Sequence, residues 1–264
     1  MPSPFNKRPL LFFFLIAFGL TWAIISPLAY YYESIKDKTI LYELWHSLGA
    51  LGPTLAALIL IGFSTKEEKQ TFKNRFNFRF LHSPLQVVLA LSLLGLMLLA
   101  LLLDYFIQGQ WFDFAAWAEE KKLTHLGSWT LYLIPMLSYG FFEEIGWRGF
   151  ALPRLQLKYH ATLSSLILSL LWASWHFPMF FYRFDYDVGM TIGFVVGLMF
   201  GTFLLTAILN TTRSVWACII WHMSWNLVSP IDPDGLSAYM SMGIMLMVVL
   251  IFIFWGWRKL SPKL

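Results

Sequence analysis

The sequence predicts an all-α protein, a polytopic transmembrane helical bundle of about eight spans in a single domain, residues 1–264. Of the 264 residues, 58% are hydrophobic and 19% are aromatic, whereas only 13% are charged. Soluble domains are about 25% charged, because their surfaces face water. The chain also has thirteen Trp and eleven Tyr residues, which suits a protein that lines two membrane–water interfaces. We therefore expect a multi-pass protein of the cell membrane.

Apolar runs along the chain set the predicted spans. They cover Leu10 to Tyr32, Leu41 to Phe63, Leu85 to Ile107, a run from Ser128 through Glu143 and Glu144, Ala161 to Tyr182, Met190 to Leu209, Ser214 to Val228 and Ala238 to Trp257. Residues 65–84 mix basic and aromatic side chains, which predicts an interfacial segment against anionic lipid head groups.

The distribution of basic residues predicts the orientation. With eight spans, 14 of the 19 Lys and Arg residues fall on the side of the two termini and 5 on the other side. Under the positive-inside rule, both termini then face the cytoplasm. Because the basic residues are spread among the loops, the net charge of +4 gives no reason to expect a nucleic-acid partner.

Three charged residues stand at the end of the fourth apolar run: Glu143, Glu144 and Arg148. A charge inside the bilayer costs about 2.5–3.5 kcal/mol even on insertion scales, so a functional role is the default hypothesis. Glu144 and Arg148 are four residues apart on a helix and can neutralise each other as a structural pair. Glu143 is turned by about 100° and has no such partner.

Other polar side chains within the spans are His176 in the fifth and His222 with Asn226 in the seventh. His222 and Asn226 share a helical face, and Pro178 favours an opening of the helix after His176. Each histidine taken singly could equally form a structural hydrogen bond across helices. Together with Glu143 they predict the lining of a polar cavity.

The predicted spans place Glu143 and His176 at different depths in the membrane. The predicted boundaries put Glu143 and His176 about 10–15 Å apart in depth, at 1.5 Å per residue. We therefore expect the fourth helix to continue past Arg148, or the helices to tilt. In the sixth span, Gly193, Gly197 and Gly201 form a small-xxx-small pattern that predicts a closely packed neighbouring helix, either from the same chain or from a second copy of it.

Several protease classes are excluded by their motifs. The sequence has no His-Glu-x-x-His helix and no Gly-x-Ser-x-Gly nucleophile, so zincins and α/β-hydrolase-type serine enzymes are ruled out. The single cysteine, Cys218, predicts no disulfide framework and is expected to be a buried apolar residue.

The polar residues resemble those of the CAAX-protease and bacteriocin-processing family, also called the abortive-infection family, of intramembrane endopeptidases. Its Glu-Glu-x-x-x-Arg motif matches residues 143–148, and its His-x-x-x-Asn motif matches His222 and Asn226. Its Phe-x-x-x-His motif matches at His176, with Trp172 in the aromatic position. The resemblance covers residues 128–230, which we expect to be the catalytic core.

The resemblance implies a role for each motif residue. Glu143 and His176 would activate a water for attack on a peptide carbonyl, and His222 and Asn226 would stabilise the oxyanion. The supporting residues would be Glu144, Arg148 and Trp172. The family has been described both as metalloproteases and as glutamate-dependent hydrolases. We assign no cofactor. Zinc is the alternative, with Glu143, His176 and His222 as its ligands.

The expected function is hydrolysis of a peptide bond near the cytoplasmic membrane face, from a polar cavity that opens towards the cytoplasm. The expected partners are a peptide or protein substrate and the lipid bilayer. Two alternatives stay open. One is a non-catalytic membrane peptide-binding or bacteriocin-immunity protein that uses the same cavity. The other is a transporter in which Glu143 and the histidines relay protons.

Overall fold

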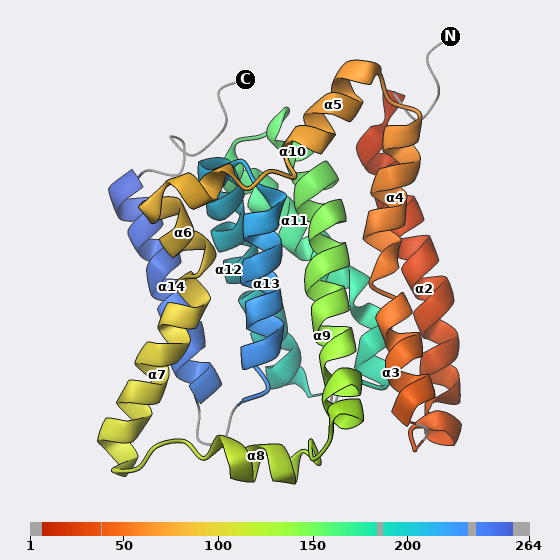
Figure 1. Cartoon of the computed structure of the whole chain (residues 1–264). Coiled ribbons are helices and arrows are strands. Elements are labelled where there is room, and N and C mark those ends of the chain that lie inside the picture. Colours follow the sequence, from red (N-terminus) through yellow and green to blue (C-terminus); the bar gives the residue numbers. More distant parts are fainter. Residues whose placement is uncertain (1–6, 38, 184–186, 232–235, 256–264) are drawn as a thin grey trace.

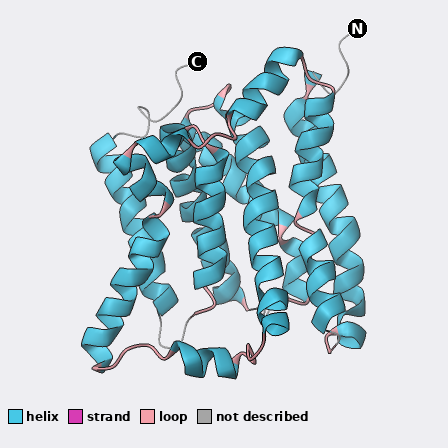
Figure 2. Ribbon diagram, in the orientation of Figure 1, coloured by secondary structure: helices cyan, strands magenta, loops and turns pink. Residues whose placement is uncertain are grey.

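Every described secondary-structure element of the computed structural model is helical (Figure 2). The structure describes residues 7–37, 39–183, 187–231 and 236–255. Its elements are α2 (Pro9–Ile35), α3 (Thr39–Leu48), α4 (Leu51–Gly62), α5 (Lys66–Asn74), η1 (Arg79–His82), α6 (Pro84–Ala90), α7 (Ser92–Gln108), α8 (Phe114–Glu120), α9 (Leu126–Gly146), η2 (Trp147–Ala151), α10 (Leu152–Gln156), α11 (Ala161–Trp175), η3 (Phe177–Phe181), α12 (Val188–Thr212), α13 (Val215–Val228) and α14 (Leu236–Trp255). The predicted all-α fold is confirmed.

Four described helices are long and apolar enough to cross a membrane: Pro9–Ile35, Ile40–Gly62, Ala161–Phe181 and Val188–Thr212. The bent pair of α6 and α7 would be a fifth, and α13 and Met240–Phe252 are apolar but shorter. The chain is therefore a multi-pass membrane protein. The total of about eight spans and the side of the termini stay predictions.

Two of the predicted spans are broken rather than continuous. The second divides into α3 and α4 at Gly49 and Ala50, where the Thr21 hydroxyl of α2 donates to the Gly49 carbonyl at 2.8 Å. A Cβ at Gly52 would lie 2.1 Å from the Thr21 Oγ1, so a side chain at that position would separate α2 from the break. The third predicted span bends by 64° between α6 and α7.

The fourth helix continues past Arg148, as expected. After α9 a π-helical segment, η2, leads directly into α10. Glu143 is thirteen residues before the end of α10, and His176 is fifteen residues after the start of α11. At 1.5 Å per residue, both residues lie about 20 Å from the turn that joins the two helices. The extension of the helix therefore removes the predicted difference in depth.

One end of the bundle carries the basic segment that contains α5. The start of α2 and the end of α14 lie at the same end of the bundle as α5, and α8 lies at the opposite end (Figure 1). A capping box of Thr65 and Glu68 begins α5. Arg75 follows it and donates to the Gly149 carbonyl at 3.1 Å. Burial, with a smaller effect from Arg154, lowers the pKa of Arg75 to about 10, so this arginine is still charged at neutral pH.

Candidate active site

A cavity of about 480 Å³ lies within the bundle, and Glu143, Trp172, His176, His222 and Asn226 all line it. They come from α9, from α11 and the residue that ends it, and from α13. Contacts between α9 and α13 and between α11 and α12 hold these helices together around the cavity. Glu144 and Arg148 lie behind the wall, fully buried. The structure thus brings the cavity-lining residues of all three motifs to one space.

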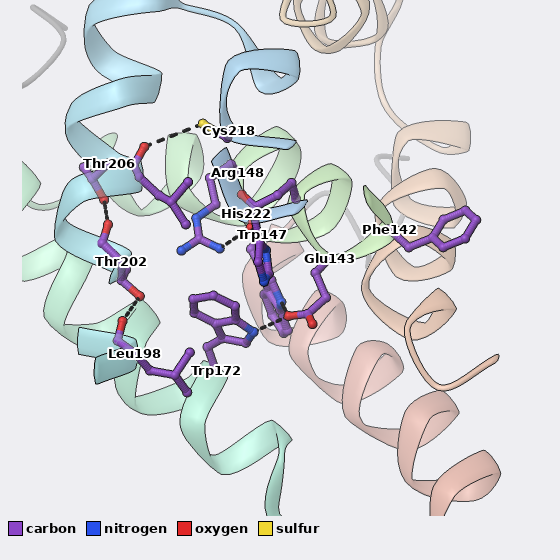
Figure 3. Close-up of polar contacts among 12 residues, drawn as sticks. Phe142, Glu143, Trp147, Arg148, Trp172, Leu198, Thr202, Thr206, Cys218 and His222 are labelled. Atoms are coloured by element: carbon purple, nitrogen blue, oxygen red, sulfur yellow. Dashed lines mark hydrogen bonds and ion pairs between the residues drawn. The ribbon is translucent and has the colours of Figure 1, made fainter. Parts of the chain in front are cut away.

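Glu143 is held by two indole groups (Figure 3). Its side chain is 1% exposed, and its Oε2 accepts hydrogen bonds from the Nε1 of Trp147, at 3.0 Å, and from the Nε1 of Trp172. Both donors are neutral, which agrees with the prediction that Glu143 has no charged partner. Trp172 therefore supplies a hydrogen-bond donor to Glu143, whereas the phenylalanine typical of the motif has no N–H to donate.

Glu144 forms the predicted ion pair with Arg148, at 2.8 Å, and both side chains are 0% exposed. The same oxygen, Oε1, also lies 2.7 Å from the Nδ1 of His222. The Arg148 guanidinium carbon lies 4.3 Å from the centre of the Trp172 ring. The pair is therefore more than a helix brace, since it also fixes the imidazole of His222 across to α13. Sequence spacing does not reveal this contact, which joins residues 78 positions apart.

The hydrogen-bond partners of His176 and His222 define which ring nitrogen of each is left to contact a water or a substrate. The Nδ1 of His176 lies 2.8 Å from the Trp172 carbonyl oxygen. A carbonyl only accepts, so this Nδ1 carries the hydrogen and Nε2 has the lone pair in the neutral ring. The Nδ1 of His222 donates to Glu144 in the same way, which leaves its Nε2 available. The Nδ2 of Asn226 donates to the Met136 carbonyl at 3.0 Å and keeps a second N–H.

The predicted pairing of Glu143 with His176 is indirect. Each binds a different atom of Trp172, Glu143 through the indole nitrogen and His176 through the carbonyl oxygen. No hydrogen bond between Glu143 and His176 is present in the described part of the chain. Both residues also line the cavity, so the two groups face the same space.

The zinc alternative does not fit these side chains. Among the described residues, no three His, Cys, Asp or Glu side chains are grouped so that they could hold a metal ion. The described structure therefore does not group Glu143, His176 and His222 as the ligands of a zinc ion.

A second polar cluster lines the same cavity and was missed from the sequence. The Nδ1 of His46, on α3, lies 2.6 Å from the Tyr182 hydroxyl. The Tyr139 hydroxyl donates to the His46 carbonyl at 3.0 Å, and the two rings are stacked 4.7 Å apart. Arg183 follows Tyr182 and also lines the cavity. The signal in the sequence for this cluster is a histidine, His46, inside the second apolar run, as His176 and His222 lie inside theirs.

The glycine pattern of α12 serves the cavity rather than a neighbouring helix. Gly193, Gly197 and Gly201 all line the cavity, and a Cβ built at each would meet no atom within 4 Å. No described helix of the same chain therefore packs closely against these three positions, and a second copy of the chain as the neighbour stays a prediction. The absence of side chains keeps this wall of the cavity open.

The cavity extends from Glu143 towards the α8 end of the bundle. On α9 it is lined by Pro135, Met136 and Tyr139, which precede Glu143. No described residue of α9 after Glu143 lines it. The basic end, with α5, lies on the other side (Figure 1). The cavity therefore extends away from the end of the bundle that holds the described ends of the chain, and its opening towards the cytoplasm stays a prediction. The sequence placed Glu143 near the end of its span, but η2 and α10 continue the helix beyond it.

The comparisons with known proteins agree with the motifs. The model of a family described as type II CAAX prenyl endopeptidase Rce1-like matches residues 125–228, a range that includes Glu143, His176, His222 and Asn226. The chain is also similar to CAAX prenyl protease 2 of Methanococcus maripaludis. The two are 27% identical over 241 residues, which cover 86% of each protein.

Proposed function

Because this chain belongs to the CAAX-protease family of membrane endopeptidases, we propose that it cuts a peptide bond next to a lipid-modified cysteine, with a water activated by Glu143. The observation that carries this proposal is the convergence of Glu143, His176, His222 and Asn226 on one cavity. A membrane protein that only binds a peptide has no need of a buried carboxylate, two oriented imidazoles and an amide around one space.

Glu143 is the base in this mechanism. One carboxylate oxygen is held by the two indoles, so the other is left for a water hydrogen. The Nε2 of His176 accepts the second hydrogen of the same water and orients it. As the water oxygen bonds to the peptide carbonyl carbon, its proton passes to Glu143. That proton then goes to the amide nitrogen as the carbon–nitrogen bond breaks, which regenerates the carboxylate.

His222 and Asn226 stabilise the charge that develops on the carbonyl oxygen. The Glu144 carboxylate lies behind the His222 ring, at Nδ1, so it stabilises an imidazolium whose Nε2–H donates to the oxyanion. The second N–H of Asn226 is the other donor, because its first is held by Met136. Each donor of an oxyanion hole contributes about 10²–10³ in rate.

The substrate class follows from the cavity and the relative. Apart from its polar groups, the cavity is lined by apolar side chains such as Phe194, Leu198, Leu205, Ile244 and Met245 and by the α12 glycines. The archaeal relative is called a CAAX prenyl protease, and a CAAX sequence is a C-terminal cysteine, two aliphatic residues and a final residue, with the lipid on the cysteine. We propose the same substrate for this chain.

Purified protein in detergent, incubated with a farnesylated CAAX peptide and its unmodified counterpart, tests the proposal. We expect mass spectrometry to show release of the last three residues from the farnesylated peptide, at a higher rate than from the unmodified one. A chelator should leave the rate unchanged, because no step uses a metal. Binding of either peptide without any cleavage would contradict the proposal and support the peptide-binding alternative.

A further inference from the structure

Arg183 is the only arginine or lysine among the described residues that line the cavity. It lies in the turn after η3, where its backbone N–H donates to the Met179 carbonyl at 2.8 Å. Its side chain is 30% exposed, unlike the fully buried Arg148. The three sequence motifs and the proposed mechanism give this guanidinium no role.

The orientation of the guanidinium is fixed from one side. Its Nη1 donates to the Tyr42 hydroxyl at 3.0 Å and to the Glu43 Oε1 at 3.3 Å, and both residues belong to α3. Burial lowers the pKa of Arg183, but the neighbouring Tyr42 and Glu43 outweigh that effect and raise the pKa above its ordinary value. Arg183 is therefore a permanent cation in the cavity wall.

The other edge of the guanidinium has unused donors. Arginine has five N–H groups, of which Nη1 carries two. In the described part of the chain, the Nε and Nη2 atoms have no hydrogen-bond partner, and neither is a fully buried unsatisfied atom. This edge is the one that binds a carboxylate through two parallel hydrogen bonds.

The distance from Glu143 to Arg183 can be followed along the two helices. Tyr139 is one turn from Glu143 on α9, and it stacks on His46 of α3. Tyr42, which binds Arg183, is one turn from His46 in the same direction, towards the α8 end. Two helical turns make about 11–12 Å. Three extended residues span about 10 Å, so a released tripeptide would reach from the scissile bond to Arg183.

We propose that Arg183 binds the free C-terminal carboxylate of the substrate and so selects peptides whose scissile bond is three residues from the end. This inference rests on the proposed function, since it assigns the same cavity a subsite for the chain terminus. Glu43 and Tyr42 position the guanidinium, and Glu143 remains the base. A peptide that continues past the third residue, or ends in an amide, offers this cation no carboxylate.

The test compares one farnesylated CAAX peptide as its free acid and as its C-terminal amide. For the wild type we expect kcat/KM to be about 10–100-fold higher for the acid, as charge-assisted hydrogen bonds allow. Arg183→Gln should reduce this preference to less than about 3-fold by slowing cleavage of the acid alone. Arg213→Gln is the matched control, because Arg213 is exposed at the other end of α12 and should keep the preference.

Glu43→Gln separates recognition from structure. If Arg183 only stabilises α3 through its ion pair, Glu43→Gln and Arg183→Gln should have equal effects on both peptides. We expect Glu43→Gln to keep the acid preference, because the glutamine carbonyl oxygen can still accept from the Arg183 Nη1 and the contact with the Tyr42 hydroxyl remains. Equal cleavage of acid and amide by the wild type, an intact preference in Arg183→Gln, or an equal loss in both variants would overturn the proposal. No cleavage of either peptide by the wild type would instead refute the proposed function.

Discussion

Replacing Glu143 with glutamine should lower kcat/KM for peptide cleavage by about 10²–10⁴-fold, the range that a general base contributes. Glutamine has the same shape, and its carbonyl oxygen can accept from the Trp147 and Trp172 indoles as the carboxylate oxygen does. The side chain therefore stays in place but can no longer take a proton from water. Steady-state cleavage of the farnesylated peptide measures the loss, and binding of the labelled peptide should remain within about 3-fold of wild type.

Two further variants test whether the loss of cleavage is specific to the Glu143 carboxylate. Glu119→Gln changes an exposed carboxylate on α8 and should leave the rate unchanged. Trp172→Phe restores the aromatic residue of the family motif but removes one donor to Glu143, so it should slow cleavage less than Glu143→Gln does. Wild-type rates in Glu143→Gln would show that another group is the base.

The second large effect is on stability. Replacing Arg148 with methionine should lower the free energy of unfolding by about 3–5 kcal/mol, because it leaves a buried carboxylate without its cation. Both side chains of the pair are 0% exposed, and the Glu144 Oε1 would keep only His222 as its partner. Equilibrium unfolding in a denaturing detergent, followed by tryptophan fluorescence, measures the change.

A double variant and a surface pair provide the controls. Glu144→Gln combined with Arg148→Met removes the buried charge as well as its partner, so it should be less destabilised than Arg148→Met alone. Lys121→Met breaks an exposed pair with Glu120 and should change the stability by about 0–1 kcal/mol. If Arg148→Met were as stable as Lys121→Met, the pair would have no structural role.

The fold class follows from composition and run length, but the breaks within the helices do not. Apolar residues continue through Leu91, so the bend there needs the packing of other helices to be seen. Gly52 and Pro53 follow the first break and favour one in this region, but its position at Gly49 and Ala50 also depends on packing. Thr21 of α2 stabilises the first break by its hydrogen bond to Gly49. The π-helical segment after Gly146 is equally invisible, because residues 147–151 read as an ordinary helix continuation.

For the site, sequence reasoning succeeded where helix periodicity decides the geometry. The Glu144–Arg148 pair is four residues apart and forms as predicted. Contacts between distant residues were missed, such as those from Glu144 to His222 and from the Trp172 indole to Glu143. The contact from Trp147 to Glu143, one helical turn apart, was also missed although helix periodicity allows it. The α12 glycines show the same limit. Their spacing is right for a close helix contact, and only the tertiary structure shows that they face a cavity.

The most direct measurement of whether this cavity is the active site is cleavage by a variant that fills it. Gly197 lines the cavity with open space beyond its Cα, and leucine is a better helix former than glycine. Gly197→Leu should therefore fold but lose about 10²-fold in kcat/KM, because it displaces the peptide from Glu143. Gly95→Leu on α7 is the matched control, since Gly95 also faces open space but does not line the cavity. Wild-type cleavage by a folded Gly197→Leu would contradict the assignment of the reaction to this cavity.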